Sequence, residues 1–268
     1  MAEGSETVAG ASGEVPQGER VHEDLIAAMA DLYGSHRGSR ALHAKGVWAE
    51  GVFAATPEAA GLCRAPQLAG ERVPALIRFS NASGKPNAHD ADRNGGGMAV
   101  KLRSDRGSEW DVIGVAPPVF VSRTVEDFLE LLRLRKPDPE TGQPDMAALG
   151  EYLGRHPEAQ LAIQSTLGKE PPASYVTVPY YSPHAFKLIG GDGDSLLDPT
   201  ELWPEGRETL VAGRLEITGL VADPEGSGHI EVFDPTRLPD GIEPSDDPIL
   251  RARPKAYSVS AYRRLDEG

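Results

Sequence analysis

Short apolar runs separated by glycine and proline fill the chain from residue 47 to residue 122. These runs predict strands at residues 47–55, 75–82, 98–103, 110–114 and 118–122. The 30 Gly and 23 Pro of the chain suit turns and the ends of strands, whereas both residue types weaken helices. The frequent glycine and proline residues argue against a helical bundle and favour a β-rich fold.

Helical periodicity predicts an amphipathic helix at residues 21–34, where apolar residues recur at helical spacing before a glycine. Thr124 can cap a second helix, VEDFLELLRL, and Asp145 can cap a third, MAALGEYLGRH. A fourth helix is predicted from Pro157 to Leu167. The remaining predicted elements are strands at 174–181, 184–189, 209–221 and 228–233 and a helical segment at about 246–263.

The charge and the cysteine content exclude several classes of function. A formal net charge of -14 argues against non-specific binding to nucleic acid and against docking on anionic lipid, because both need a cationic face. The single cysteine, Cys63, excludes an internal disulfide, a thiolate zinc site and a CxxC redox pair. We expect Cys63 to be a small buried residue in a protein from a reducing compartment.

The first 19 residues are mostly small or acidic and are predicted to be disordered. They lack the basic start and the apolar run of a secretory signal, and no segment of the sequence is long and apolar enough to span a bilayer. We therefore expect a cytoplasmic protein with one folded domain, residues 20–268.

Two glycine-rich stretches and the histidines offer no strong site signal. NGGGMAVK at 94–101 leads into a strand, whereas a phosphate-binding loop leads into a helix, so it is predicted to be a turn. GGDGDS at 190–195 lacks the alternating ligands of a calcium loop and is predicted to be a hairpin turn. The seven histidines show no HExxH or paired metal spacing.

Polar residues within apolar segments are the more informative signal. In ALIRFSN, the period of two places Arg78 and Ser80 on one face of a strand. That face is either solvated or the polar inner wall of a barrel that holds an anionic ligand. Arg253 and Tyr257 stand four residues apart and can meet on one helical face, although Pro254 disfavours straight helical geometry there. His43, in RALHAKGVWAEGVF, is either a structural or a catalytic histidine.

Five segments in order resemble the landmark segments of the heme catalase family: RALHAKGVWAEGVF, LIRFSNASG, GGGMAVKL, WDVIGVAPPVF and GIEPSDDPILRARPKAY. The resemblance spans roughly residues 37–265 and is loose at 135–231. Because the chain is short for a catalase, it is most similar to the compact, catalase-related peroxidase branch. The resemblance implies an α+β fold, with an antiparallel β-barrel of about eight strands and flanking helices. It also implies that residues 20–268 form a single catalase-like heme-binding domain.

The resemblance implies roles for residues on both sides of a heme. His43 matches the distal histidine, which as a neutral imidazole takes a proton from peroxide and returns it to the departing oxygen. Ser80 matches the distal serine that bonds the second ring nitrogen of this histidine and fixes its tautomer. Tyr257 matches the tyrosinate ligand of iron, and Arg253 favours the ionised phenol, which supports a high oxidation state at iron.

Further matches concern the periphery of the cofactor. Arg40, Arg78 and Arg264 match the arginines that bind the heme propionates, with Arg263 as the alternative to Arg264. The aromatic residues that wall the distal pocket match Phe120 and Phe128. No CxxCH attachment motif is present, so the expected cofactor is noncovalent heme b.

Val115 is the main departure from the family, because it stands where true catalases have a distal asparagine. A missing donor hinders the oxidation of a second small peroxide, so the expected activity is a heme peroxidase with weak or no catalase activity. The expected partners are hydrogen peroxide or an organic hydroperoxide and an organic electron donor. Two alternatives stay open: an enzyme that rearranges or cleaves fatty-acid hydroperoxides, and a heme-binding protein without turnover. The reductant, the oligomeric state and the role of residues 135–231 also stay open.

Overall fold

The computed structural model describes residues 17–91, 96–167, 169–190, 194–195, 209–225 and 230–266. Its first helix, α1 (Gln17–Tyr33), begins before the predicted start at residue 21. Residues 17–19, which were predicted to belong to a disordered tail, are therefore helical, and the rest of that tail lies outside the described residues. Within the described part of the chain, no helix is long and apolar enough to cross a membrane.

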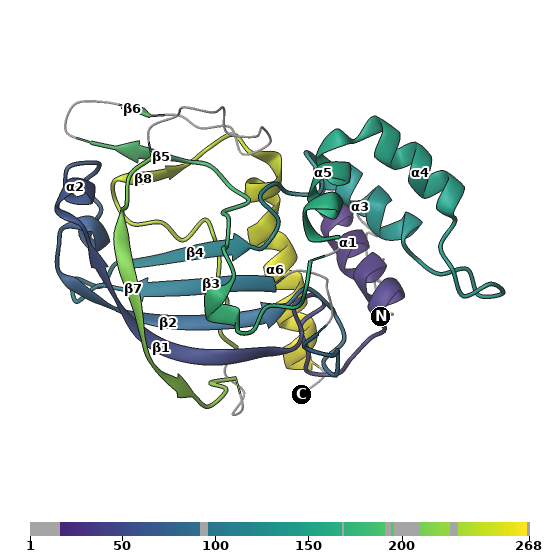
Figure 1. Cartoon of the computed structure of the whole chain (residues 1–268), viewed down its shortest axis with the longest axis horizontal. Helices are drawn as coiled ribbons and strands as arrows, with labels where there is room; N and C mark the ends of the chain where they lie inside the picture. Colours follow the sequence, from purple (N-terminus) through teal and green to yellow (C-terminus); the bar gives the residue numbers. More distant parts are fainter. Residues whose placement is uncertain are drawn as a thin grey trace, which may run out of the picture.

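A five-stranded antiparallel sheet forms the main layer, in the order β4-β3-β2-β1-β7 (Figure 1). Its strands are β1 (Gly46–Ala55), β2 (Arg72–Asn81), β3 (Gly96–Arg103), β4 (Glu109–Val115) and β7 (Gly213–Val221). Each of these strands was predicted to within a few residues. In β2 successive side chains point to opposite faces of the sheet, as predicted. Ile77 and Phe79 pack in an apolar core on one face, whereas Arg78 and Ser80 lie on the other face.

A smaller antiparallel sheet has the order β6-β5-β8, with β5 (Phe186–Ile189), β6 (Asp194–Ser195) and β8 (Ile242–Pro244). An isolated bridge joins Val115, at the end of β4, to Tyr181. The structure is thus α+β with antiparallel sheets, as predicted, but the described strands pair into two sheets and not into a closed barrel.

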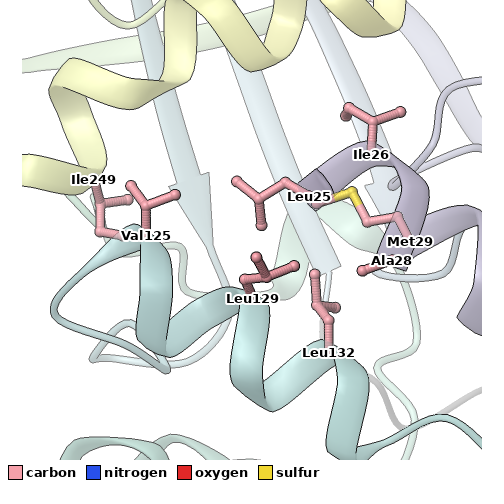
Figure 2. Packing of buried hydrophobic residues seen from close by; sticks show 8 residues of the cluster. All are labelled: Leu25, Ile26, Ala28, Met29, Val125, Leu129, Leu132 and Ile249. Carbon is pink, nitrogen blue, oxygen red and sulfur yellow. The ribbon is translucent and has the colours of Figure 1, made fainter. Parts of the chain in front are cut away.

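Helices α1, α3 (Val125–Leu134) and α6 (Pro248–Asp266) pack together beside the main sheet, with α4 (Met146–Arg155) and α5 (Pro157–Thr166) further out (Figure 1). Thr124 and Asp145 cap α3 and α4 through side-chain bonds to backbone N–H groups, as predicted. Figure 2 shows the shared core of α1, α3 and α6, which consists of Leu25, Ile26, Ala28, Met29, Val125, Leu129, Leu132 and Ile249. The short helix α2 (Pro57–Ala60) and the 3-10 turns Pro66–Leu68 and Tyr175–Thr177 complete the helical elements.

Three predicted strands are wrong where the structure describes them. Residues 118–122 are irregular, because two successive prolines at 117 and 118 remove the backbone donors that a ladder needs. Residues 174–181 form a 3-10 turn and the isolated bridge, since the Ser174 side chain caps the turn. Residues 230–233 are irregular because charged side chains bind their carbonyl groups: Arg40 binds that of Glu231, and Lys101 that of Val232.

The predictions for the glycine-rich stretches and for Cys63 agree with the structure as far as it describes them. Strands β5 and β6 pair as a hairpin, and residues 191–193 of the predicted turn lie outside the described residues. Gly96 and Gly97 open strand β3, not a helix, while residues 92–95 are not described. Cys63 is buried in a small apolar core.

Candidate functional site

A cavity of about 230 Å³ lies between the inner face of the main sheet and helices α1, α3 and α6. Every site residue that we predicted from the sequence lines it: Arg40, His43, Arg78, Ser80, Val115, Phe120, Phe128, Arg253, Tyr257 and Arg264. These residues come from segments that are more than 200 positions apart along the chain, so the fold brings the whole predicted constellation together. The solvated alternative for the Arg78 and Ser80 face is wrong, because both residues are buried.

His43 lies in the loop before β1 and has a φ of 56°. This left-handed conformation is uncommon for a residue other than glycine, and strained backbone of this kind is concentrated at functional sites. Its Nδ1 lies 2.7 Å from the carbonyl oxygen of Asn81 and 3.1 Å from Oγ of Ser80. A carbonyl only accepts, so Nδ1 carries the proton and donates it to Asn81, which leaves Nε2 as the acceptor. The tautomer therefore depends first on a backbone carbonyl that the sequence did not indicate, with Ser80 as a second neighbour.

Burial lowers the pKa of His43 to about 4, and the positive charges of Arg78, Arg253 and Arg40 contribute in the same direction. The hydrogen bond to Asn81 opposes the shift but does not cancel it. The imidazole is therefore neutral at physiological pH and able to accept a proton at Nε2.

Gly97 provides the space that the His43 ring occupies. A Cβ added at Gly97 would lie 2.9 Å from Cε1 and 3.0 Å from Nδ1 of His43, and 3.0 Å from Oγ of Ser80. The contact with Cε1 is shorter than real Cβ contacts and the other two are unusually tight, so a side chain at this position requires the ring to shift. From the sequence, Gly97 was placed in the turn before the strand predicted at 98–103, so this role was not indicated.

Arg253 and Tyr257 face the cavity from α6, four residues apart. The Nη1 group of Arg253 donates to the Tyr257 hydroxyl at 2.6 Å, which confirms the predicted contact. Helix α6 continues through Pro254, so the two residues meet on one helix. The guanidinium also lies 5.5 Å from the ring centroid of Phe120, and Phe120 packs against Phe128 at 5.5 Å.

The start of α6 is anchored by a buried pair. Nδ1 of His184 donates to Oδ2 of Asp247 at 2.8 Å, and Oδ1 of Asp247 accepts from the backbone N–H of Ile249 at 2.8 Å. Burial lowers the pKa of His184 to about 4, with a further contribution from the positive charge of Arg253. This pair fixes the end of the helix that carries Arg253 and Tyr257.

Arginine charge is concentrated at one end of the cavity. Arg40 and Arg78 both lie 5.6 Å from the ring centroid of Trp48. Burial and the neighbouring charge of Arg40 lower the pKa of Arg78 to about 9. Among the described residues, Nε of Arg78 and Nε of Arg264 are buried without a hydrogen-bond partner. Unpaired buried donors with excess positive charge make this end of the cavity suited to an anion.

Arg264, and not Arg263, belongs to this cluster. Arg264 is buried and lines the cavity, whereas Arg263 on the same helix turn is exposed. Nη1 of Arg264 donates to Glu225 at 2.9 Å, and Glu225 also accepts both Nη groups of Arg40. No local pattern in the sequence singled out Glu225, which lies in the loop after β7.

Below the arginines, a buried ionic network continues along the inner face of the sheet. Lys101 donates to both carboxylate oxygens of Asp111 at 2.7 and 2.8 Å, and both side chains are fully buried. Arg237 also binds Asp111, and Glu231 lies 3.4 Å from Lys101. The sequence held a signal for this network. The period of two along a strand places Lys101 on the same face as Gly97 in β3, and Asp111 on the same face as Val115 in β4.

Val115 closes part of the cavity wall with an apolar side chain. Its backbone is held by two hydrogen bonds to the backbone of Tyr181, of 2.9 and 2.8 Å. A side chain at this position therefore has a fixed direction, and valine offers the cavity no donor there.

A comparison with known families agrees with this geometry. The family model described as Catalase matches residues 17–197, which is more than half of the chain. The chain belongs to the catalase family. The matched range contains His43, Arg78 and Val115, while Arg253 and Tyr257 lie beyond it.

Two compact relatives resemble most of the chain. The catalase-related peroxidase of Mycolicibacterium paratuberculosis is 34% identical over 305 residues, which cover 92% of this chain and 96% of that protein. The catalase-related peroxidase of Synechococcus elongatus is 27% identical, with coverage of 90% and 88%. The fold is similar to that of a solved bacterial catalase, with a TM-score of 0.71 at 19% identity. That alignment covers 98% of this chain but only 64% of the bacterial catalase.

Proposed function

We propose that this protein is a heme peroxidase that reduces hydrogen peroxide or organic hydroperoxides at the expense of an organic electron donor. The observation that carries the proposal is the convergence, in one cavity, of a neutral histidine, an arginine-bound tyrosine and a cluster of arginines. Two relatives of similar length are named catalase-related peroxidases, which supports the same reaction class.

The residues of the cavity fit heme b. Arg40, Arg78 and Arg264 supply positive charge, and the unpartnered Nε groups of Arg78 and Arg264 are donors suited to carboxylates such as the heme propionates. Apolar side chains of α1, α3 and α6 suit the hydrocarbon surface of a porphyrin. Tyr257, with Arg253 to stabilise its phenolate, is the residue that would bind the iron.

When bound, heme would supply the redox centre for the reduction of hydrogen peroxide to two water molecules, or of an organic hydroperoxide to an alcohol and water, with two electrons and two protons that come from the donor. The Nε2 atom of His43 accepts the proton of the hydroperoxide and returns it to the departing oxygen. The leaving group is then neutral water or alcohol, which lowers the barrier to cleavage of the O–O bond. Asn81 and Ser80 hold the ring so that Nε2, and not Nδ1, performs this transfer.

Val115 favours peroxidase over catalase chemistry in this proposal. Loss of one preorganised donor typically costs about 100-fold to 1000-fold in rate where it acts in the transition state. The cost falls on the oxidation of a second hydrogen peroxide, which is small and needs a donor to orient it. A larger organic donor is oriented by apolar contacts and depends less on such a group.

The test uses the full chain, purified and loaded with hemin. We expect about one noncovalent heme per chain, and peroxide reduction that consumes an organic donor such as a phenol. His43→Ala should keep heme, because the arginines and Tyr257 remain, but cleave peroxide at least about 100-fold more slowly in stopped flow, as expected for loss of a general acid and base. Tyr257→Phe should instead bind heme loosely.

Three outcomes would contradict the proposal. A protein that fails to bind hemin cannot be a heme enzyme, and unaltered peroxide cleavage in His43→Ala would show that this residue does not transfer the proton. Consumption of an organic hydroperoxide without consumption of the donor would identify a rearranging or cleaving enzyme instead.

A further inference from the structure

A carboxylate of the protein itself occupies the arginine end of the cavity. Oε2 of Glu225 accepts Nη1 of Arg40 at 2.5 Å, and Oε1 accepts Nη2 of Arg40 at 2.8 Å, Nη1 of Arg264 at 2.9 Å and the backbone N–H of Glu231 at 3.1 Å. A forked contact of this kind is the geometry in which arginine binds any carboxylate ligand.

This carboxylate takes up the donors that a ligand would need. Both Nη groups of Arg40 bind Glu225, and Nη2 also binds the carbonyl of Glu231, so the fork of Arg40 cannot hold a second carboxylate at the same time. Arg264 gives one of its two Nη groups to Glu225, and its Nε has no partner among the described residues.

The placement of Glu225 suits a group that can leave. It lies in the loop after β7, outside every helix and strand. Arg40 lies in the loop between α1 and β1, where its guanidinium lies 5.6 Å from the ring centroid of Trp48, and Arg264 lies on α6. Loop segments rearrange at lower cost than packed elements. Because Arg264 is fixed on a packed helix and the Arg40 guanidinium stacks on Trp48, we expect Glu225 to be the partner that moves when the cluster binds a ligand.

We propose that Glu225 is an internal placeholder for a heme propionate: it pairs with Arg40 and Arg264 in the heme-free protein and is displaced by a propionate when heme binds. The inference rests on the proposed function, since it takes heme as the ligand. Glu225 thereby stabilises the heme-free protein, because buried guanidinium groups without a partner are costly, and it weakens heme binding by competing for the same donors.

The experiment measures how heme partitions between this protein and apomyoglobin at equilibrium, for the wild type, Glu225→Ala and Glu225→Gln. Removal of the competitor should shift the partition toward this protein by at least about 10-fold, because the Glu225 contacts are lost only from the heme-free state. Glu216→Ala is the matched control: this residue of β7 is exposed, pairs with Arg72 and lies outside the cavity. Heme dimethyl ester, which lacks free propionates, is the matched ligand control.

We expect Glu225→Ala and Glu225→Gln to bind heme more tightly than the wild type, with no change for the dimethyl ester or for Glu216→Ala. The heme-free Glu225 variants should also melt at a lower temperature than the wild type, while the heme-loaded proteins melt together. Unchanged or weaker heme partition in both Glu225 variants, or equal destabilisation of the heme-free and heme-loaded forms, would overturn the placeholder role. Failure of the wild type to bind heme at all would overturn the proposed function itself.

Discussion

Replacement of Gly97 by alanine tests whether the position of His43 controls activity. Gly97 lies near the start of β3, an inner strand of the sheet, where it pairs with Ser80 on one side and with Val115 on the other. Because both neighbours hold its backbone, a new Cβ cannot retreat from the cavity. The His43 ring, on a loop, must move instead.

The size of this movement follows from the distances. Cε1 of His43 must shift by about 0.5 Å, from 2.9 Å to the 3.4 Å of an ordinary contact with the new Cβ. The shift strains the 2.7 Å bond between Nδ1 and Asn81 and displaces Nε2 by a similar amount. A misplacement of 1 Å can cost about 100-fold in rate, so about 10-fold is expected here. The crowding should also lower the free energy of unfolding by about 1 to 3 kcal/mol.

The assay is the rate of peroxide cleavage per bound heme in stopped flow, together with the heme content and the urea unfolding curve. Gly150→Ala is the control, because a Cβ at this position in α4 meets nothing within 4 Å. We expect Gly97→Ala to keep its heme and lose rate, and Gly150→Ala to keep both. A Gly97→Ala protein that is destabilised as predicted but cleaves peroxide at the wild-type rate would refute the link between ring position and catalysis.

Two further predictions concern Val115 and His184. Val115→Asn, which adds donors at nearly constant volume, should raise oxygen evolution from hydrogen peroxide per heme, and an unchanged rate at a Clark electrode would show that this position does not limit catalase activity. Because burial lowers the pKa of His184 from 6.5 to about 4, its contribution to stability is complete above pH 6.5 and is lost as the pH falls toward 4, where the unfolded chain binds the proton first. The expected loss in the free energy of unfolding, measured with urea, is on the order of 3 kcal/mol. His184→Asn keeps a donor for Asp247 but cannot titrate, so its stability should decline less as the pH falls. An equal decline in both proteins would show that His184 is not the titrating group.

Much of the fold and of the candidate site could be predicted from local patterns. The caps at Thr124 and Asp145 and the alternation around Arg78 depend on neighbouring residues only, so helix starts and strand faces follow from the sequence. The motifs around His43 and Tyr257 resemble those of a known family, and this resemblance predicted ten residues that do line the cavity. Where local pattern and tertiary context disagree, as at 174–181 and 230–233, the strand propensity did not decide the outcome, because caps and charged side chains bind that backbone instead.

Only the tertiary structure decided which groups complete the site. The carbonyl of Asn81 sets the His43 tautomer, Gly97 leaves room for the ring, and Glu225 pairs with Arg40 from 185 positions away. None of these residues has an unusual local pattern, because a carbonyl, an absent side chain and a loop carboxylate acquire a role only from what the sheet register and the loop path place beside them. Local interactions determine dihedral angles and periodicity, whereas contacts between distant segments depend on how the whole chain packs.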